Sequence, residues 1–83
     1  MKVVYFARLR ERVGLREEPL APPPEVATIA DLVAWLVARG DNYAAAFADA
    51  ATVRAAINRG HVKHDAPIAG AREIAFFPPM TGG

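Results

Sequence analysis

The side chains best suited to metal binding or acid–base catalysis are two histidines and one pair of adjacent glutamates. His61 and His64 are three residues apart in a segment that we predict to be a strand, and Glu17 and Glu18 are neighbours in another. Because successive side chains of a strand point to opposite faces, neither pair can converge on one ligand or one reacting atom. We therefore expect surface histidines, no metal site and no catalytic carboxylate pair.

Nucleophilic side chains are scarce in this chain. It has no cysteine and no serine, which excludes disulfides, thiolate metal sites and a serine or cysteine nucleophile. Three threonines remain, Thr28, Thr52 and Thr81, and no base is placed in the sequence to activate them. A glycine-rich phosphate loop between a strand and a helix is also absent from the sequence. The side chains therefore argue against a self-sufficient enzyme.

The segment 76–83, FFPPMTGG, offers a reactive group of another kind. Pro78 and Pro79 cannot donate ladder hydrogen bonds, so a strand must end there and the last four residues should protrude as a flexible tail. The pair Gly82–Gly83 has no Cβ and could pass through a narrow channel in a partner. At its tip lies the α-carboxylate of Gly83, which ATP can convert to an acyl-adenylate that a sulfur or amine nucleophile then attacks.

The composition is that of one small globular domain. The 83 residues are 53% apolar and 23% charged, with a net charge of +1, and a chain of this length buries roughly 60–65% of the surface that its unfolded form exposes. The arginines are scattered and lack the basic stripe and stacking aromatics that nucleic-acid binding requires. No apolar stretch reaches the ~18 residues of a membrane span, and no signal-peptide layout is present. We expect a cytoplasmic protein without nucleic-acid or membrane partners.

Two strands and one long helix are predicted in the first half of the chain. Residues 2–9 alternate in a period of two, residues 10–14 could add a helical turn, and residues 15–21 should pair back on the first strand as a hairpin. After a proline-rich connector, residues 28–40 predict a helix with Thr28 as N-cap and Gly40 as the C′ residue. One face of this helix should be buried by its apolar stripe, which consists of Ile29, Leu32, Val33, Leu36 and Val37.

The second half predicts a short helical turn and three more strands. The turn covers residues 42–50, and the strands cover 53–58, 61–64 and 72–77, with a tight turn at Arg59–Gly60. This order predicts an α+β fold of the β-grasp arrangement, a mixed five-stranded sheet covered on one side by one main helix. If the first and last strands lie side by side, Phe6 and Phe77 become neighbours on the uncovered face. Such an apolar patch would suit docking.

Three segments carry a resemblance to a known family. VVYFARLRE (3–11), AAINRGHV (55–62) and EIAFFPPMTGG (73–83) resemble the MoaD-type sulfur carriers of the ubiquitin-like β-grasp superfamily, the small subunits of molybdopterin synthase. The resemblance covers essentially the whole chain. A diglycine alone is shared by every relative, whereas FFPP-x-TGG is much more specific to this branch. The resemblance implies a β-grasp domain over residues 1–79 and a flexible tail over residues 80–83.

The resemblance also implies a function. An E1-like enzyme would use ATP to adenylate Gly83, a sulfur donor would convert it to a thiocarboxylate, and the tail would enter the large subunit of molybdopterin synthase. There its sulfur would be transferred to cyclic pyranopterin monophosphate. Thr81 and Gly82 would thread the channel, and Phe6 and Phe77 would form the docking face. His61 takes a third docking position that is usually aliphatic in the family.

On this reading the protein is the sulfur-donating, non-catalytic subunit of a sulfurtransferase. It would hold no cofactor of its own and would join two large subunits in a heterotetramer. Three other functions stay open: a sulfur carrier for thiazole or a thiolated tRNA, a ubiquitin-like modifier joined to lysines through Gly83, and a binding module with an inert tail. The length of the chain and its FFPP segment argue against the thiazole carrier.

Overall fold

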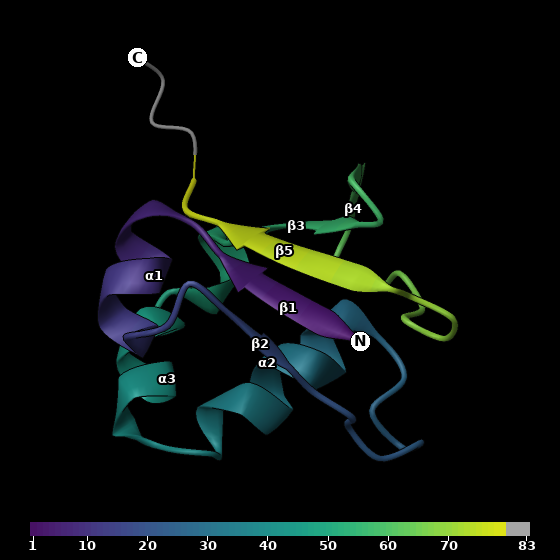
Figure 1. Ribbon diagram of the computed structural model, residues 1–83, viewed down its shortest axis with the longest axis horizontal. Helices are drawn as coiled ribbons and strands as arrows, with labels where there is room; N and C mark the ends of the chain where they lie inside the picture. Colours follow the sequence, from purple (N-terminus) through teal and green to yellow (C-terminus); the bar gives the residue numbers. More distant parts are fainter. Residues whose placement is uncertain (80–83) are drawn as a thin grey trace.

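A mixed five-stranded sheet with helices on one side makes up the computed structural model, which describes residues 1–79 (Figure 1). The strands are ordered β2-β1-β5-β3-β4. Their bounds are β1 Lys2–Tyr5, β2 Glu17–Pro19, β3 Arg54–Ile57, β4 Gly60–Val62 and β5 Glu73–Phe77. β1 and β5 run parallel at the centre, and the other strand pairs of the sheet are antiparallel. The predicted β-grasp arrangement is confirmed.

The main helix, α2 (Ile29–Val37), begins as its sequence predicts. Thr28 Oγ1 accepts a hydrogen bond from the Asp31 N–H, and the Asp31 carboxylate accepts one from the Thr28 N–H, which together form a capping box. The apolar stripe faces the sheet, and Trp35 is half-buried on its flank. Residues 1–79 contain three shorter helical segments besides α2: α1 Ala7–Val13, α3 Asp41–Ala46 and the 3₁₀ turn η1 Ala50–Thr52.

The first strand is shorter than the alternation predicts. β1 ends at Tyr5, and Ala7 begins α1 with a left-handed φ of 50°. From there the chain is helical, so Leu9 and Val13 reach the core at i and i+4. Leu9 fits both the alternation of a strand and the apolar spacing of a helix. The alternation therefore predicted a strand beyond Phe6, where the chain is helical. The predicted helical turn at 10–14 is the end of this longer helix.

Two connections also differ from the prediction. Gly40 has an extended φ of 169° and precedes α3, so it is not the left-handed C′ residue of α2, which ends at an Ala38 cap. The turn between β3 and β4 is Asn58–Arg59, one residue earlier than predicted, and both residues have positive φ (47° and 73°), as a two-residue hairpin turn requires. Because β4 therefore ends at Val62, His64 lies outside the strand.

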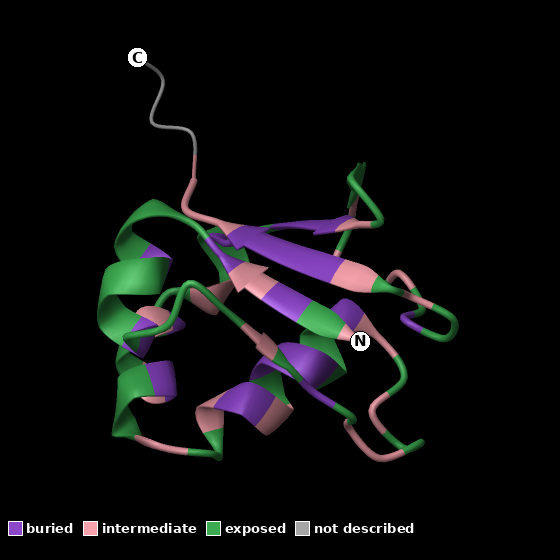
Figure 2. Ribbon diagram, viewed as in Figure 1, coloured by how far each residue is buried: buried purple, intermediate pink, exposed green. Residues whose placement is uncertain are grey.

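The core fills the space between the sheet and its helices (Figure 2). Phe76, in the central strand β5, is 0% exposed and lies among other aromatic rings. Its ring meets the edge of Phe47 at a centroid distance of 5.1 Å and stacks with Tyr5 at 6.4 Å. The neighbouring strand position, Phe77, points the other way and is only half-buried. Adjacent phenylalanines thus serve opposite faces of the sheet.

A polar network joins β1, β2 and α3 beneath the sheet. Glu18 Oε2 accepts hydrogen bonds from the hydroxyls of Tyr5 (2.8 Å) and Tyr43 (2.6 Å). Arg39 Nη2 lies 3.8 Å from Glu18 Oε1, and its guanidinium covers the Trp35 ring at 4.9 Å. Burial, and then the nearby Glu18 carboxylate, raise the pKa of both tyrosines above the ordinary 10.0. The folded protein therefore keeps both phenols protonated in alkaline solution.

We expect this network to make the protein sensitive to alkali. Above pH 10 the unfolded chain loses phenolic protons that the folded chain keeps, so ionisation favours unfolding. The tyrosine contribution to stability is complete below pH 10, and above it the free energy of unfolding falls by up to about 1.4 kcal/mol per pH unit for each tyrosine. Because Tyr5 and Tyr43 are the only tyrosines, phenolate absorbance should appear together with the change in Trp35 fluorescence on unfolding. Phenolate that forms near pH 10 in the folded protein would contradict this expectation.

Candidate functional site

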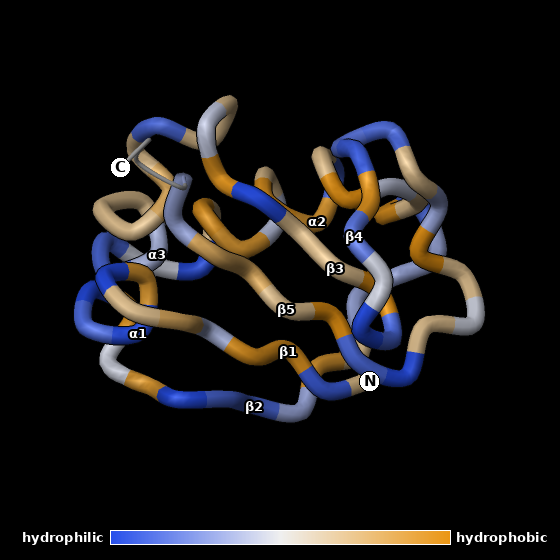
Figure 3. Tube along the Cα trace, turned by 90° about the horizontal axis from the view of Figure 1, so that it is seen from above, coloured by the Kyte–Doolittle hydropathy of each residue, from blue (hydrophilic) through white to orange (hydrophobic). Residues whose placement is uncertain are grey.

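The candidate site lies on the sheet face that turns away from the helices, which we call the open face (Figure 3). The strand register aligns Val4 of β1 with Ala75 of β5, Ala75 with Ala56 of β3, and Ala56 with His61 of β4. Cross-strand partners share a face of the sheet, so these residues form one row across it. Glu17 of β2, the register partner of Val4, continues the row at its other end, so three of its five members are small or aliphatic. The open face is therefore mostly apolar at its centre.

Two phenylalanine rings extend this row from His61 toward the end of β5. Phe6 and Phe77 stack with their centroids 4.6 Å apart and an interplanar angle of 8°, and the His61 ring lies 5.5 Å from Phe77. The Phe6 N–H donates to the carbonyl of Phe76 at 3.1 Å, which fixes Phe6 beside β5. We call Phe6, His61 and Phe77 the aromatic seat. The prediction that the two phenylalanines are neighbours is confirmed, and the role of the seat in binding stays a prediction.

The seat leaves apolar surface in contact with water. Phe6 is 42% exposed, and within residues 1–79 the only other large apolar side chain of comparable exposure is Leu15, at 43%. Single exposed apolar residues are common on proteins, but a stacked pair that continues an apolar row is not a scattered exception. Aromatic rings at such positions contribute strongly to protein–protein binding. The seat therefore has the chemistry of an interface centre.

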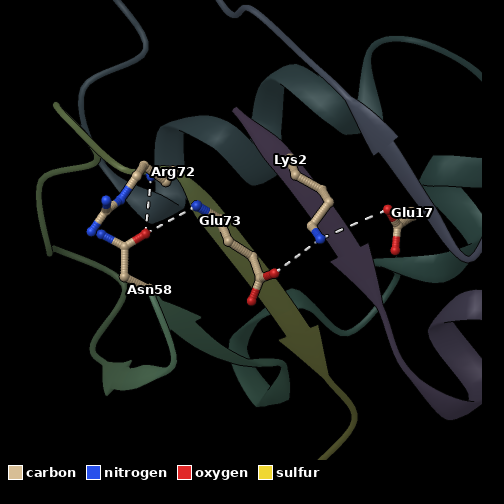
Figure 4. A network of polar contacts seen from close by, with 5 residues as sticks. All are labelled: Lys2, Glu17, Asn58, Arg72 and Glu73. Atoms are coloured by element: carbon tan, nitrogen blue, oxygen red, sulfur yellow. Dashed lines mark hydrogen bonds and ion pairs between the residues drawn. The ribbon is translucent and has the colours of Figure 1, made fainter.

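A polar network lies at the opposite end of the open face (Figure 4). Lys2 Nζ lies 3.3 Å from a Glu73 carboxylate oxygen and 3.8 Å from one of Glu17. Nearby, Asn58 Oδ1 accepts hydrogen bonds from the backbone N–H groups of Arg72 and Glu73, which ties the β3–β4 turn to the start of β5. Exposed ion pairs of this kind contribute less than about 1 kcal/mol each. Their main effect is that charges at this end neutralise one another.

The chain leaves the sheet through Pro78 and Pro79, next to the aromatic seat. Pro79 lines two grooves. One groove, beside η1 and the β3–β4 hairpin, includes Arg54 and both histidines, and the other, beside α1, α3 and η1, includes Arg8 and Arg12. In the sequence these arginines form no run and looked scattered, and Arg8 was assigned to a strand. On a helix, Arg8 and Arg12 are one turn apart and lie on one side. Their spacing of four residues would have indicated this grouping if the segment had been assigned to a helix.

The remaining predicted positions do not assemble into a further site. His64 Nε2 is 2.6 Å from the carbonyl of Val53. His64 lies outside β4 and lines the same groove as His61, so the prediction that a strand directs the two rings to opposite faces is wrong. Glu17 pairs with Lys2, whereas Glu18 pairs with the tyrosines, so the two carboxylates diverge as predicted. Residues 1–79 contain no group of three metal-ligating side chains and no helix long and apolar enough to cross a membrane. Thr81, Gly82 and Gly83, and with them the predicted tail 80–83, lie outside the described residues.

Comparison with known proteins gives consistent matches along the whole chain. The model of the ThiS family matches residues 3–83. The molybdopterin synthase sulfur carrier subunit of Escherichia coli (strain K12) is 37% identical over 83 residues, which cover 100% of this chain and 99% of that protein. A solved structure, the putative molybdopterin converting factor, subunit 1, from Pyrococcus furiosus, has a TM-score of 0.72 at 30% identity, with 95% of each chain covered. SAMP1 from Haloferax volcanii also has a TM-score of 0.72, at 24% identity over 100% of this chain and 98% of that one, a likeness of fold alone.

Proposed function

The chain belongs to the ThiS family, and from this premise we propose that it is the sulfur carrier subunit of a molybdopterin synthase. The observation that carries the proposal is the 37% identity, over 99% of its length, to a relative with that name. The family match extends to Gly83, so it includes the residues to which the chemistry is assigned. The name of the relative favours molybdopterin over thiazole or tRNA thiolation. It also favours a carrier over a modifier of lysines.

The proposed chemistry takes place on the carboxylate of Gly83. An E1-like enzyme uses ATP to form the acyl-adenylate of Gly83, with release of pyrophosphate. A sulfur nucleophile then displaces AMP, so that the carboxylate becomes a thiocarboxylate. The sulfur passes on to cyclic pyranopterin monophosphate in the large subunit. The chain itself needs no cofactor for these steps, because ATP is consumed by the activating enzyme.

The folded domain presents the C-terminal segment to the partner. β5 is held on both sides by β1 and β3, so the point at which the chain leaves the sheet is fixed in space. Pro78 and Pro79 restrict the backbone directly after it. The aromatic seat lies beside this exit, and a large subunit that covers Phe6 and Phe77 would receive residues 80–83 in a defined direction. We place Thr81 and Gly82 in the channel of the large subunit through which the tail passes. We also propose that the complex is a heterotetramer with two large subunits.

Truncation of the seat tests this docking. Phe77→Ala should weaken binding to the large subunit of the same organism by roughly 30-fold, because a central interface aromatic contributes about 2 kcal/mol. The fold should persist, because Phe77 is only half-buried and faces away from the core. Leu15→Ala is the control, since Leu15 is an exposed large apolar residue that lies outside the seat. Calorimetric titration measures both affinities.

Three results of that titration are informative. A loss confined to Phe77→Ala supports the proposal. Equal affinities for the wild type and both variants would exclude the seat from the interface. The absence of any binding by the wild-type chain would overturn the assignment to molybdopterin synthase.

A further inference from the structure

Positive charge gathers around the point where the chain leaves the sheet. Arg8 and Arg12 line one groove beside Pro79, and Arg54 lines the other. All three arginine side chains are exposed. Arg54 is also the register partner of Phe77, so it lies next to the aromatic seat. We call Arg8, Arg12 and Arg54 the cationic rim.

The rim charges are not neutralised within the part of the chain that the structure describes. The ion pairs there use the cations of Lys2 and Arg39, and none uses a rim arginine. Asp49 is the one acidic residue that lines either groove. The net charge of the chain is only +1, and the other cation-rich groove, which contains Arg10, Arg16 and Arg59, also contains Glu17 and Glu73.

Four of the nine acidic residues have partners away from the rim. Glu17 and Glu73 pair with Lys2 at the far end of the open face. Glu18 accepts the tyrosine hydroxyls, and Asp31 caps α2. Interactions between exposed charges are screened beyond about 8–10 Å at physiological salt, so distant carboxylates do little to offset the positive charge of the rim. Asp49 lines one groove and Glu11 precedes Arg12 on α1, so the three rim arginines keep a positive excess that a partner can balance.

The arrangement has the anatomy of a protein interface. An apolar centre, the aromatic seat, is bordered by charged residues, and arginine is enriched at such positions. A nucleic acid would need a continuous basic stripe with bases stacked on exposed rings, whereas here the exposed Phe6 ring is already stacked on Phe77. The two grooves share Thr52, Val53 and Pro79 in their linings.

We infer that the partner that receives residues 80–83 carries acidic side chains around its entrance, which face the cationic rim. This inference rests on the proposed function, since it takes the large synthase subunit as that partner. Complementary charges at the border of an interface mainly raise the association rate and set the orientation of encounter. The rim would thus align the point where the chain leaves the sheet with the entrance of the partner, before the aromatic seat contacts the partner.

A charge reversal with a matched control tests the inference. Arg8→Glu/Arg54→Glu reverses one charge in each groove, and Lys63→Glu/Arg72→Glu alters the net charge equally at exposed positions outside both grooves. Association with the purified large subunit is measured by stopped flow at low and high salt, after circular dichroism has shown which variants are folded. We expect the rim variant to associate about tenfold more slowly at low salt. The difference should shrink at high salt, and the control should stay within about twofold of the wild type.

Other outcomes would overturn the inference. Equal slowing by both variants would show an effect of net charge alone, and no slowing by either would show that the rim does not face acidic groups. Salt-sensitive binding of a single-stranded oligonucleotide that only the rim variant loses, with unchanged large-subunit association, would assign the rim to nucleic acid. If the rim variant does not fold, Arg54→Gln against Arg72→Gln repeats the comparison. A wild-type chain that binds no large subunit would overturn the proposed function itself.

Discussion

Deletion of Gly83 should abolish molybdopterin formation and leave the domain folded. The proposed chemistry takes place on the carboxylate of this residue, and a chain one residue shorter would present a carboxylate that falls short of the reacting centre. None of the core contacts of residues 1–79 is removed by the deletion. The measurement is molybdopterin production in a strain that lacks its own sulfur carrier subunit and expresses either the wild type or the variant.

Met80→Val is the matched control for the deletion, because it alters the same segment without changing the position of the carboxylate. This variant should support molybdopterin formation as well as the wild type does. A deletion variant as active as the wild type would show that Gly83 is not the sulfur-bearing residue. So would full activity of a chain extended by one residue beyond Gly83 and isolated in its extended form.

Phe76→Ala should lower the free energy of unfolding by about 3–5 kcal/mol. Phe76 is 0% exposed, and its removal leaves a cavity between Phe47 and Tyr5 that neither ring can fill without a shift of its own strand or helix. Small domains are stable by only about 0.05–0.15 kcal/mol per residue. The substitution therefore removes a large part of the stability of the domain. Urea denaturation followed through Trp35 fluorescence gives the value.

Phe77→Ala is the internal comparison, since it deletes the same side chain one residue later in the same strand. It should cost about 1 kcal/mol, mainly for the lost stacking on Phe6. A Phe77→Ala variant less stable than Phe76→Ala would mean that the assignment of the two rings to the open face and the core is reversed.

The parts of the fold that sequence analysis predicted are governed by local rules. Thr28 and Asp31 are three residues apart and form their capping box within one turn, and the apolar stripe of α2 follows from the helical period alone. The pairing of Phe6 with Phe77 is long-range, but it follows from a single assumption, the central parallel pair of strands. Each of these features could be predicted from local residue spacing or from the order of the helices and strands.

The features that were missed depend on tertiary contacts. The left-handed backbone of Ala7 is not encoded by its residue type, and without it Arg8 and Arg12 do not share a groove. The Glu18 network joins residues 13 and 25 positions apart in the chain, through hydroxyls that no periodic pattern connects. The hairpin turn needed the positive φ of Arg59, whereas sequence preference favoured Gly60.

The central claim is that the carboxylate of Gly83 carries sulfur, and the mass of the intact protein isolated from its own host tests it most directly. The account predicts a species heavier than the sequence mass by the difference between a sulfur and an oxygen atom, with the added mass on a C-terminal fragment that ends at Gly83. It also predicts that this species disappears when the activating enzyme is absent. A protein that carries only the unmodified mass while its host actively makes molybdopterin would contradict the account.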